Sequence, residues 1–319
     1  MKRKKTSLIF GISGQDGAYL SAFLLKKGYN VIGTTRNKSK KNLFRLKRLN
    51  ILDQVKIVKG KATNLSFCNK IIKNSLCEIY YLAGDSSVIR SFDNPEMSLK
   101  SNAVGILNIL TVIREKNSKI KVFNASSGQF FGDSKNNFFS LKSKIEPQSP
   151  YGIAKAVGYW YTKIYREKYD IFCCSGILFN HESSLRAKEF VTKKIIDTAK
   201  KIKSNKNIKL KLGNINVYRD WGWAPEFVEA FWLMLQKKKP QDLILGTGKT
   251  HSIKEFVNEV FKLANISKKN LISNVKNLKR KTDIRGYKAD ISFTKKELNW
   301  HPKVHFKQII YKMLNDELF

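Results

Sequence analysis

Acidic residues are scarce in this chain of 319 residues. The 25 aspartates and glutamates stand against 61 lysines and arginines, which gives a formal net charge of +36. Such an excess raises the hypothesis of a nucleic-acid partner. The lysines are spread along the chain, however, and no recognisable nucleic-acid module surrounds them. We therefore interpret them as a solvated surface whose field favours small anionic ligands, and we expect no nucleic-acid partner.

Cysteines are also few, and long hydrophobic runs are missing. The four cysteines have no CxxC spacing and no histidine cluster beside them, which argues against a zinc site and a disulfide framework. The apolar stretch after the basic start is interrupted by Gly11, and no run approaches the roughly 20 apolar residues that span a bilayer. We expect a cytoplasmic protein with free thiols in its core, no metal and no membrane partner.

A glycine-rich loop follows the first predicted strand. Residues 7–10 are apolar, the loop reads GISGQDG, and residues 18–27 have helical spacing. Between a strand and a helix, such glycines let the backbone turn tightly and approach a pyrophosphate, and the helix N-terminus offers N–H groups to the phosphates. The loop predicts a dinucleotide site formed by Gly11, Gly14, Gln15, Asp16 and Gly17.

The residue after the second predicted strand, Asn30 to Thr34, bears on the choice of cofactor. A carboxylate at this place would bind the ribose 2′-hydroxyl of NAD, whereas an arginine suits the 2′-phosphate of NADP. The sequence has Arg36 here and no acidic residue. We therefore predict NADP, with Arg36 among its contacts.

Strand and helix patterns alternate over the first half of the chain. Near-continuous apolar strands are expected at 55–58, 78–82 and 121–125, with helices at 64–74 and 95–116. Strands of this kind separated by helices indicate a parallel sheet that is covered on both faces. The predicted fold class is α/β, a doubly wound (Rossmann) parallel sheet with a smaller mixed C-terminal lobe.

A serine, a tyrosine and a lysine give a sharper signal than the glycines. Ser127 follows the predicted strand 121–125, and Tyr151 and Lys155 stand four residues apart in a helix behind Pro150. Side chains four apart share one helix face, and a nearby ammonium favours the phenolate form of a tyrosine. Tyr151 is therefore predicted as the base of a hydride-transfer reaction, Lys155 as its activating cation, and Ser127 as the partner of the substrate hydroxyl.

Six segments carry a resemblance to a known family. They are GISGQDG at 11–17, SPYGIAK at 149–155, GILFNHES at 176–183, FVTKKI at 190–195, RDWG at 219–222 and VEAFWLML at 228–235. With these segments the chain resembles the extended short-chain dehydrogenases/reductases and, within that group, is closely similar to GDP-mannose 4,6-dehydratases. The resemblance extends over nearly the whole chain.

The resemblance implies an internal redox cycle in an NADP-dependent lyase. NADP would take the hydride from C4 of the mannose while Tyr151 removes the hydroxyl proton, and the resulting 4-ketone would acidify the C5 proton. Loss of that proton and of the C6 hydroxyl as water, followed by return of the hydride to C6, would give GDP-4-keto-6-deoxymannose. The cofactor would stay bound throughout.

The resemblance also implies further contacts. It places His181 and Arg186 on the cofactor. Arginine suits the diphosphate of a GDP-sugar because its fork donates two parallel hydrogen bonds. An ion pair with Asp220 is the alternative for Arg219, and a surface position is the alternative for Arg280. The residues implied on the substrate side are Ser86, Ser127, Asn180, Val191, Arg219 and Arg280.

The domain organisation follows from the same resemblance. Residues 1–179 are expected to form mainly the NADP-binding Rossmann domain, completed by a returning strand near 242–246. Residues 180–319 are expected to form mainly the sugar-nucleotide-binding lobe. The implied partners are a GDP-sugar and further copies of the chain, as a dimer or tetramer packed in part through the helix that begins at Tyr151.

Gln129 stands where the family has a catalytic glutamate, two residues after Ser127. That glutamate would remove the C5 proton, and a neutral amide cannot accept it. Gln129 is either an engineered change that traps the substrate, or natural, with Asp133 or a water taking the proton. The chain could instead be a GDP-4-keto-6-deoxy-sugar reductase or epimerase, which needs only hydride transfer. A segment at 85–87, Asp-Ser-Ser in place of the family's Gln-Ser-His, adds a dehydratase of another GDP-sugar, such as a GDP-heptose.

Overall fold

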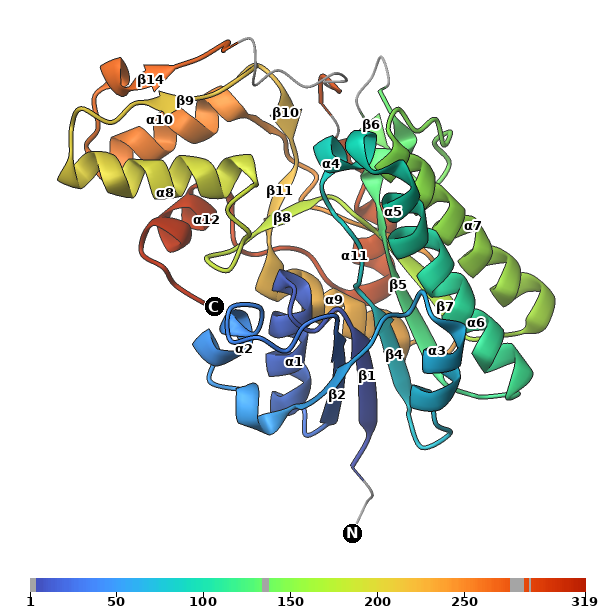
Figure 1. Ribbon diagram of the computed structural model, residues 1–319. Helices are drawn as coiled ribbons and strands as arrows, with labels where there is room; N and C mark the ends of the chain where they lie inside the picture. Colours follow the sequence, from blue (N-terminus) through green and yellow to red (C-terminus); the bar gives the residue numbers. More distant parts are fainter. Residues whose placement is uncertain (1–3, 134–137, 276–283, 287) are drawn as a thin grey trace.

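The computed structural model describes residues 4–133, 138–275, 284–286 and 288–319 of the chain. In these ranges, seven parallel strands form one sheet in the order β12-β7-β5-β4-β1-β2-β3 (Figure 1). The order reverses between β1 and β4, as in a doubly wound sheet, which confirms the predicted fold class. The strands are β1 (Thr6–Phe10), β2 (Asn30–Thr35), β3 (Lys56–Lys59), β4 (Glu78–Tyr81), β5 (Lys121–Ser127), β7 (Cys173–Leu178) and β12 (Leu243–Leu245).

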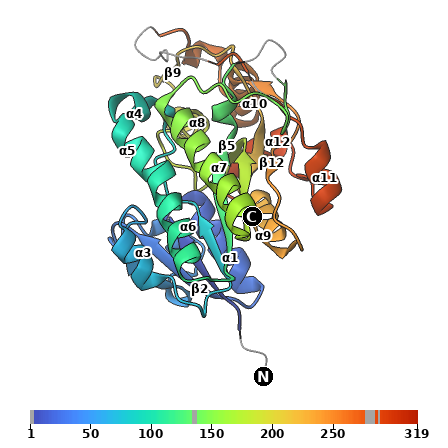
Figure 2. The ribbon, with the colours of Figure 1, turned by 90° about the vertical axis from the view of Figure 1, so that its right-hand side faces the viewer.

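Helices cover both faces of this sheet. They are α1 (Gln15–Lys26) and α9 (Ala224–Gln236) on one face, and α3 (Leu65–Ile71), α6 (Gly105–Glu115) and α7 (Pro150–Tyr169) on the other (Figures 1 and 2). Side chains along a strand point alternately to the two faces. Ile9 of β1 accordingly packs with α1 and α9, whereas Leu8 and Phe10 pack with α3 and α6. Each face therefore has its own hydrophobic core.

The helix predicted over 95–116 is interrupted. It consists of α5 (Pro95–Leu99), a π-helical turn at Lys100–Val104, and α6. The Asn102 side chain within this turn donates hydrogen bonds to the carbonyl oxygens of Ser98 and Asp85. Such turns often mark functional sites. The hydrophobic spacing of the sequence does not indicate this turn. The contacts described here are made by a polar side chain, that of Asn102.

The strand predicted near 242–246 returns to the main sheet as β12, which pairs with β7. Helix α11 (Ser292–Leu298) packs beside it, and Thr294 Oγ1 donates to the carbonyl oxygen of Ile244 at 2.6 Å. Two segments from the last third of the chain thus support the sheet. The division near residue 180 stays a prediction.

A smaller lobe lies beyond the carboxyl ends of the strands (Figure 1). Helices α8 (Val191–Ser204), α10 (Ile253–Ala264) and α12 (Phe306–Leu314) pack around a hydrophobic cluster of their own. Strand β8 follows β7 closely and pairs with β11, which joins the lobe to the sheet.

The short strands are β6 (Phe138–Phe139), β8 (Asn180–Glu182), β9 (Leu210–Lys211), β10 (Tyr218–Arg219), β11 (Trp221–Trp223), β13 (His251–Ser252), β14 (Leu271–Ile272) and β15 (Lys288–Ala289). The remaining helical segments are α2 (Phe44–Arg48), α4 (Val88–Asp93) and the 3₁₀ turns η1 (Leu52–Gln54), η3 (Gly128–Phe131) and η4 (Lys268–Asn270).

The four cysteines are free thiols. Cys68, Cys173 and Cys174 are buried as predicted, whereas Cys77 is only half-buried. Over the described ranges, no helix combines the length and the apolar character needed to cross a membrane.

Candidate active site

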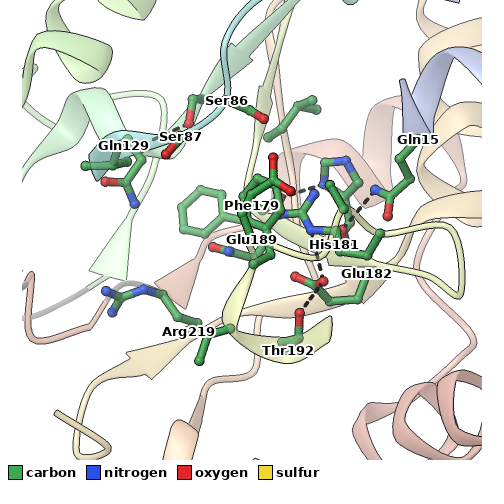
Figure 3. A pocket seen from close by; sticks show the side chains of 18 of the residues that line it. Gln15, Ser86, Ser87, Gln129, Phe179, His181, Glu182, Glu189, Thr192 and Arg219 are labelled. Atoms are coloured by element: carbon green, nitrogen blue, oxygen red, sulfur yellow. Dashed lines mark hydrogen bonds and ion pairs between the residues drawn. The ribbon is translucent and has the colours of Figure 1, made fainter. Parts of the chain in front are cut away.

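A cleft lies at the carboxyl ends of the central strands, between the sheet and the smaller lobe. Its volume of about 540 Å³ falls in the range of ligand pockets, roughly 300–1,000 Å³. Figure 3 shows Gln129 and Ser87 on one side and Gln15 and His181 on the other. The cleft lining includes the predicted site residues Gly14, Gln15, Asp16, Gly17, Ser86, Ser127, Gln129, Tyr151, Lys155, Asn180, His181, Arg186, Val191 and Arg219.

The glycine loop turns tightly between β1 and α1. A Cβ atom at Gly17 would lie 2.3 Å from the carbonyl oxygen of Gly11, so this position accepts only glycine. Gly11 contributes to the turn through its positive φ of +93°. Residues 14–17 line the cleft. The N-terminus of a helix carries unpaired N–H groups and partial positive charge. This end of the cleft therefore suits a phosphate.

Asp16 and His181 form an ion pair that joins the glycine loop to strand β8. The Nε2 atom of His181 lies 3.0 Å from Asp16 Oδ2, and its Nδ1 lies 2.8 Å from the carbonyl oxygen of Phe179. Both partners can only accept hydrogen bonds, so both ring nitrogens carry protons. Burial lowers the pKa of His181, but the charge of Asp16 outweighs this and raises it. Burial also raises the pKa of Asp16, and His181 and Gln15 lower it to about 2.

Glu182 fixes a second cation of the cleft. Its buried carboxylate accepts a hydrogen bond from Thr192 Oγ1 at 2.6 Å and lies 3.1 Å from Nε of Arg186. The guanidinium of Arg186 also stacks on Phe190, 3.6 Å from the ring centre. Arg186 is thereby held at the cleft wall, beside the Asp16–His181 pair.

Arg45 is a cleft residue that the sequence did not reveal. Its Nε donates to the carbonyl oxygen of Leu185 at 2.8 Å, and its Nη1 donates to that of Ser13 at 3.1 Å. It belongs to α2, a five-residue helix in a lysine-rich stretch that carries no periodic signal. Arg36, by contrast, is exposed just after β2 and is not among the residues that line the cleft. Its contact with a 2′-phosphate stays a prediction.

The start of α7 is packed closely against the turn that follows β5. Ser149 caps the helix, because its Oγ accepts a hydrogen bond from the backbone N–H of Gly152 at 3.1 Å. A Cβ atom at Gly152 would lie 2.9 Å from the carbonyl oxygen of Gln129. The absence of that atom lets Tyr151 and Gln129 share one wall of the cleft.

Lys155 is buried one helical turn after Tyr151. Its Nζ donates to the carbonyl oxygen of Ala125 at 2.7 Å and lies 5.7 Å from the centre of the Tyr151 ring. Burial lowers the pKa of Lys155 to about 8, against the opposing effect of Asp16. At pH 7 the side chain is therefore mostly an ammonium, which favours a phenolate on Tyr151. Ser127 completes this group at the end of β5, where its Oγ accepts from the backbone N–H of Gln129 at 3.3 Å.

Comparison with known proteins agrees with this geometry. The family model described as GDP-mannose 4,6 dehydratase matches residues 8–313. The chain belongs to the GDP-mannose 4,6-dehydratase family. GDP-mannose 4,6 dehydratase 1 of Arabidopsis thaliana is 38% identical to it, over 100% of this chain and 91% of the relative. The human GDP-mannose 4,6 dehydratase is 35% identical, over 99% of this chain and 92% of the relative.

A solved structure shares the fold at low sequence identity. The dTDP-glucose 4,6-dehydratase of Bacillus anthracis, in complex with NAD, superposes with a TM-score of 0.85 at 21% identity, over 98% of this chain and 96% of that one. GDP-mannose 4,6-dehydratases use tightly bound NADP, which confirms at the level of the family the cofactor predicted from the sequence. The cradle under Gly17 and the two fixed cations, His181 and Arg186, fit a dinucleotide.

Gln129, which the resemblance places at the position of the family's glutamate, lines one wall of the cleft. It is set by η3, the short turn that begins directly after Ser127. Asp133, the alternative proton acceptor, is not among the residues that line the cleft. Removal of the C5 proton by Asp133 stays a prediction.

The substrate-side residues predicted from the resemblance come to the cleft from several elements. Asn180 begins β8, Val191 begins α8, and Ser86 lies in the segment after β4. The buried Arg219 donates Nη1 hydrogen bonds to the carbonyl oxygens of Tyr218 and Ile284. Arg280 lies outside the described residues. The roles of these residues stay predictions.

Asp220 follows Arg219 and has a different set of partners. Its buried carboxylate accepts hydrogen bonds from Thr247 N and Oγ1, and from the backbone N–H groups of Gly248 and Ala289. Burial raises its pKa to about 6, although these hydrogen bonds oppose the rise. Asp220 thus connects the loop after β12 to β15, and its hydrogen bonds indicate a structural role.

Proposed function

We propose that the chain is a lyase that binds GDP-mannose in this cleft and forms GDP-4-keto-6-deoxymannose. The observation that carries the proposal is the convergence of Ser127, Tyr151 and Lys155 on the cleft that the glycine loop also lines. This arrangement occurs in a chain that matches the family over nearly its whole length.

The residues that bind the cofactor and the substrate would have the following roles. The N-terminus of α1 would hold the pyrophosphate of NADP, with His181 and Arg186 beside it and Arg45 as a further cation. When bound, NADP supplies reversible hydride transfer, away from C4 and later to C6 of the sugar. Arg219 would face the diphosphate of the substrate, because its planar fork matches phosphate oxygens.

The proton steps fall to residues on the sheet side of the cleft. Ser127 would donate a hydrogen bond to the C4 oxygen, and Tyr151 would remove the C4 hydroxyl proton with Lys155 stabilising the phenolate. The C5 proton and the C6 hydroxyl leave together as one water. Once C6 has been reduced, a proton from solvent would return to C5, which balances the proton that Tyr151 removes from the C4 hydroxyl. Gln129 can orient the sugar through its amide, but it cannot accept the C5 proton.

Mass spectrometry of GDP-mannose incubated with the protein and NADP tests the proposal. We expect a nucleotide sugar that is lighter by one water and carries a carbonyl that borohydride reduces. Its rate should be low, because residue 129 is not a base. The same assay with a GDP-heptose tests the alternative substrate, and absence of a product from both sugars would contradict the proposal.

Gln129 supports a second candidate function, that of a GDP-4-keto-6-deoxy-sugar reductase or epimerase. Such an enzyme needs hydride transfer at C4 but no proton removal at C5 by a residue at this position. Supplying GDP-4-keto-6-deoxymannose with NADPH distinguishes the two functions. Oxidation of NADPH with formation of a 4-hydroxyl product would favour the reductase.

We further propose that copies of the chain associate with one another through the outer face of α7. Ile153, Trp160 and Ile164 are 49%, 45% and 46% exposed and follow a helical repeat, so they form one apolar stripe. Exposed Met97 and Leu99 of α5 lie on the helix that packs beside α7. Apolar surface of this kind is typical of an interface between copies. The cytoplasmic location stays a prediction.

Trp160→Glu should convert the oligomer to monomers, because it places a charge in the centre of this stripe. Light scattering coupled to size-exclusion chromatography measures the mass directly. Tyr311→Glu, at an exposed position on α12, serves as the control and should leave the mass unchanged. A wild-type monomer, or an oligomer that survives Trp160→Glu, would refute this interface.

A further inference from the structure

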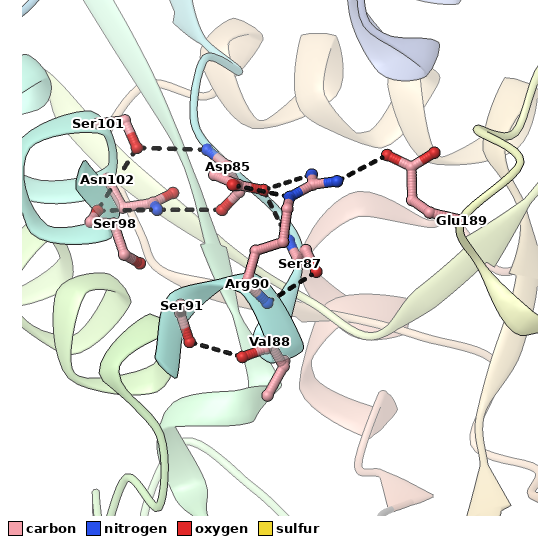
Figure 4. A network of polar contacts seen from close by, with 9 residues as sticks. All are labelled: Asp85, Ser87, Val88, Arg90, Ser91, Ser98, Ser101, Asn102 and Glu189. Carbon is pink, nitrogen blue, oxygen red and sulfur yellow. Dashed lines mark hydrogen bonds and ion pairs between the residues drawn. The ribbon is translucent and has the colours of Figure 1, made fainter. Parts of the chain in front are cut away.

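Asp85 lies in the segment after β4, and the structure gives it a defined set of partners. Its carboxylate accepts two hydrogen bonds from the Arg90 guanidinium, from Nη2 at 2.7 Å and from Nε at 3.1 Å. Its backbone N–H donates to Ser101 Oγ, and its carbonyl oxygen accepts from Asn102 Nδ2 in the π-helical turn (Figure 4). Asp85 is thus fixed at both its backbone and its side chain, and it aims Arg90.

Arg90 follows a segment that lines one side of the cleft, and its side chain reaches the segment that lines the other side. Its Nη1 lies 3.2 Å from Glu189 Oε1, which belongs to the segment just before α8 (Figure 4). Residues 86–89 on one side and 186, 187 and 189–192 on the other line the cleft. The Arg90–Glu189 ion pair therefore ties together two segments that are 99 residues apart in sequence and that flank the cleft.

The two ends of this connection differ in strength. The Asp85–Arg90 contact is bidentate, a geometry that holds an arginine well. The Arg90–Glu189 contact is a single hydrogen bond between side chains that are 48% and 46% exposed. Exposed pairs are weak and are screened by salt. If the connection opens, it opens at Glu189 and leaves Arg90 on Asp85.

We infer that Arg90 is a positioning residue that holds the cleft closed through Glu189, so that a GDP-containing ligand enters and leaves only after this ion pair opens. The inference rests on the proposed function, because it takes GDP as the ligand. Opening and closing of this kind changes the rate constants for association and dissociation in the same direction. A purely electrostatic effect of Glu189 on an anionic ligand would change them in opposite directions, since removing a negative charge speeds binding and slows release.

Glu189→Gln tests the inference with a fluorescent methylanthraniloyl derivative of GDP in stopped-flow experiments. We expect association and dissociation each to be faster by about two- to fivefold, the range for one exposed ion pair. The matched control is Glu96→Gln, which removes the exposed Glu96–Lys100 pair on α5 and should change neither rate. Added NaCl should bring wild-type dissociation up to the rate of the Glu189→Gln variant, whose own rate should respond less to salt.

A double-mutant cycle with Arg90→Gln adds a test that general loosening of the structure would not pass. If the ion pair is the closing contact, Glu189→Gln should have no further effect in the Arg90→Gln background. Additive effects, or faster association with slower dissociation in Glu189→Gln, would overturn the inference.

Failure of the proposed function can be recognised separately. If the fluorescent GDP derivative does not bind the wild-type protein, the GDP site is wrong, and hydrogen exchange of the ligand-free protein tests the closing contact by itself. Faster exchange over residues 84–90 and 186–192 in Glu189→Gln than in Glu96→Gln would support the contact. Equal exchange in the two variants would refute it.

Discussion

Gln129→Glu should raise the rate of GDP-mannose dehydration by about 10²–10⁴-fold, the usual contribution of a general base. The variant keeps the shape of the side chain and places a carboxylate on the cleft wall that also holds Tyr151. The amide of the wild-type residue leaves C4 oxidation possible and slows removal of the C5 proton. The measurement is the initial rate of 4-keto product formation by mass spectrometry.

Isotope exchange shows whether the rate increase of Gln129→Glu comes from removal of the C5 proton. In D₂O, the glutamate variant should incorporate deuterium at C5 in step with dehydration, and the wild-type protein should incorporate little. Asp133→Asn is the control for the neighbouring carboxylate and should leave both proteins unchanged. A wild-type protein that dehydrates fast, with no gain from Gln129→Glu, would show that another group carries the C5 proton.

Lys155→Met and Tyr151→Phe should each lower hydride transfer from C4 by at least about 100-fold at pH 7. Their pH profiles should differ. Without the ammonium of Lys155, Tyr151 must lose its proton unaided, so the Lys155→Met rate should recover as the pH rises. The Tyr151→Phe variant has no base to ionise and should stay slow at every pH. Reduction of NADP, followed by absorbance in single turnovers, gives both profiles.

Loss of the fold would imitate these effects, so thermal unfolding must accompany the kinetics. Methionine replaces the four-carbon stem of Lys155 but lacks the Nζ atom that donates a hydrogen bond to the carbonyl oxygen of Ala125, so a modest loss of stability is expected. A Lys155→Met variant that stays folded and active at pH 7 would contradict the assigned role of the lysine. Recovery of Tyr151→Phe at high pH would contradict the role of the tyrosine.

The sequence was most informative where local chemistry demands a particular residue. Gly17 admits no Cβ atom beside Gly11, and Tyr151 and Lys155 share a helix face, so their spacing and context singled out the glycine loop and this pair, which line one cleft. The returning strand at 243–245, by contrast, was implied by the resemblance and not by its spacing; in the structure its three residues are buried in β12.

Other parts of the cleft depend on contacts between distant segments. Arg45 is held by carbonyl oxygens of residues 32 and 140 positions away, and nothing near it in sequence distinguishes it from the surrounding cations. Glu182 lies within a recognised motif, but its hydrogen bond from Thr192 arises only once α8 packs beside β8. The π-helical turn at Asn102 is equally invisible, because an asparagine in a helical pattern gives no sign that its side chain reaches Asp85.

The position of β12 at the edge of the sheet affects how the chain folds as it is made. β7 ends at Leu178, and its outer edge stays unpaired until Leu243–Leu245 arrives. Ribosomes add about 5–20 residues per second, so this interval lasts about 3 to 13 seconds. Throughout it, a strand that is almost entirely buried in the finished protein presents free backbone groups to other nascent chains. Slower translation between these two strands should therefore increase aggregation during synthesis without changing the stability of the finished protein.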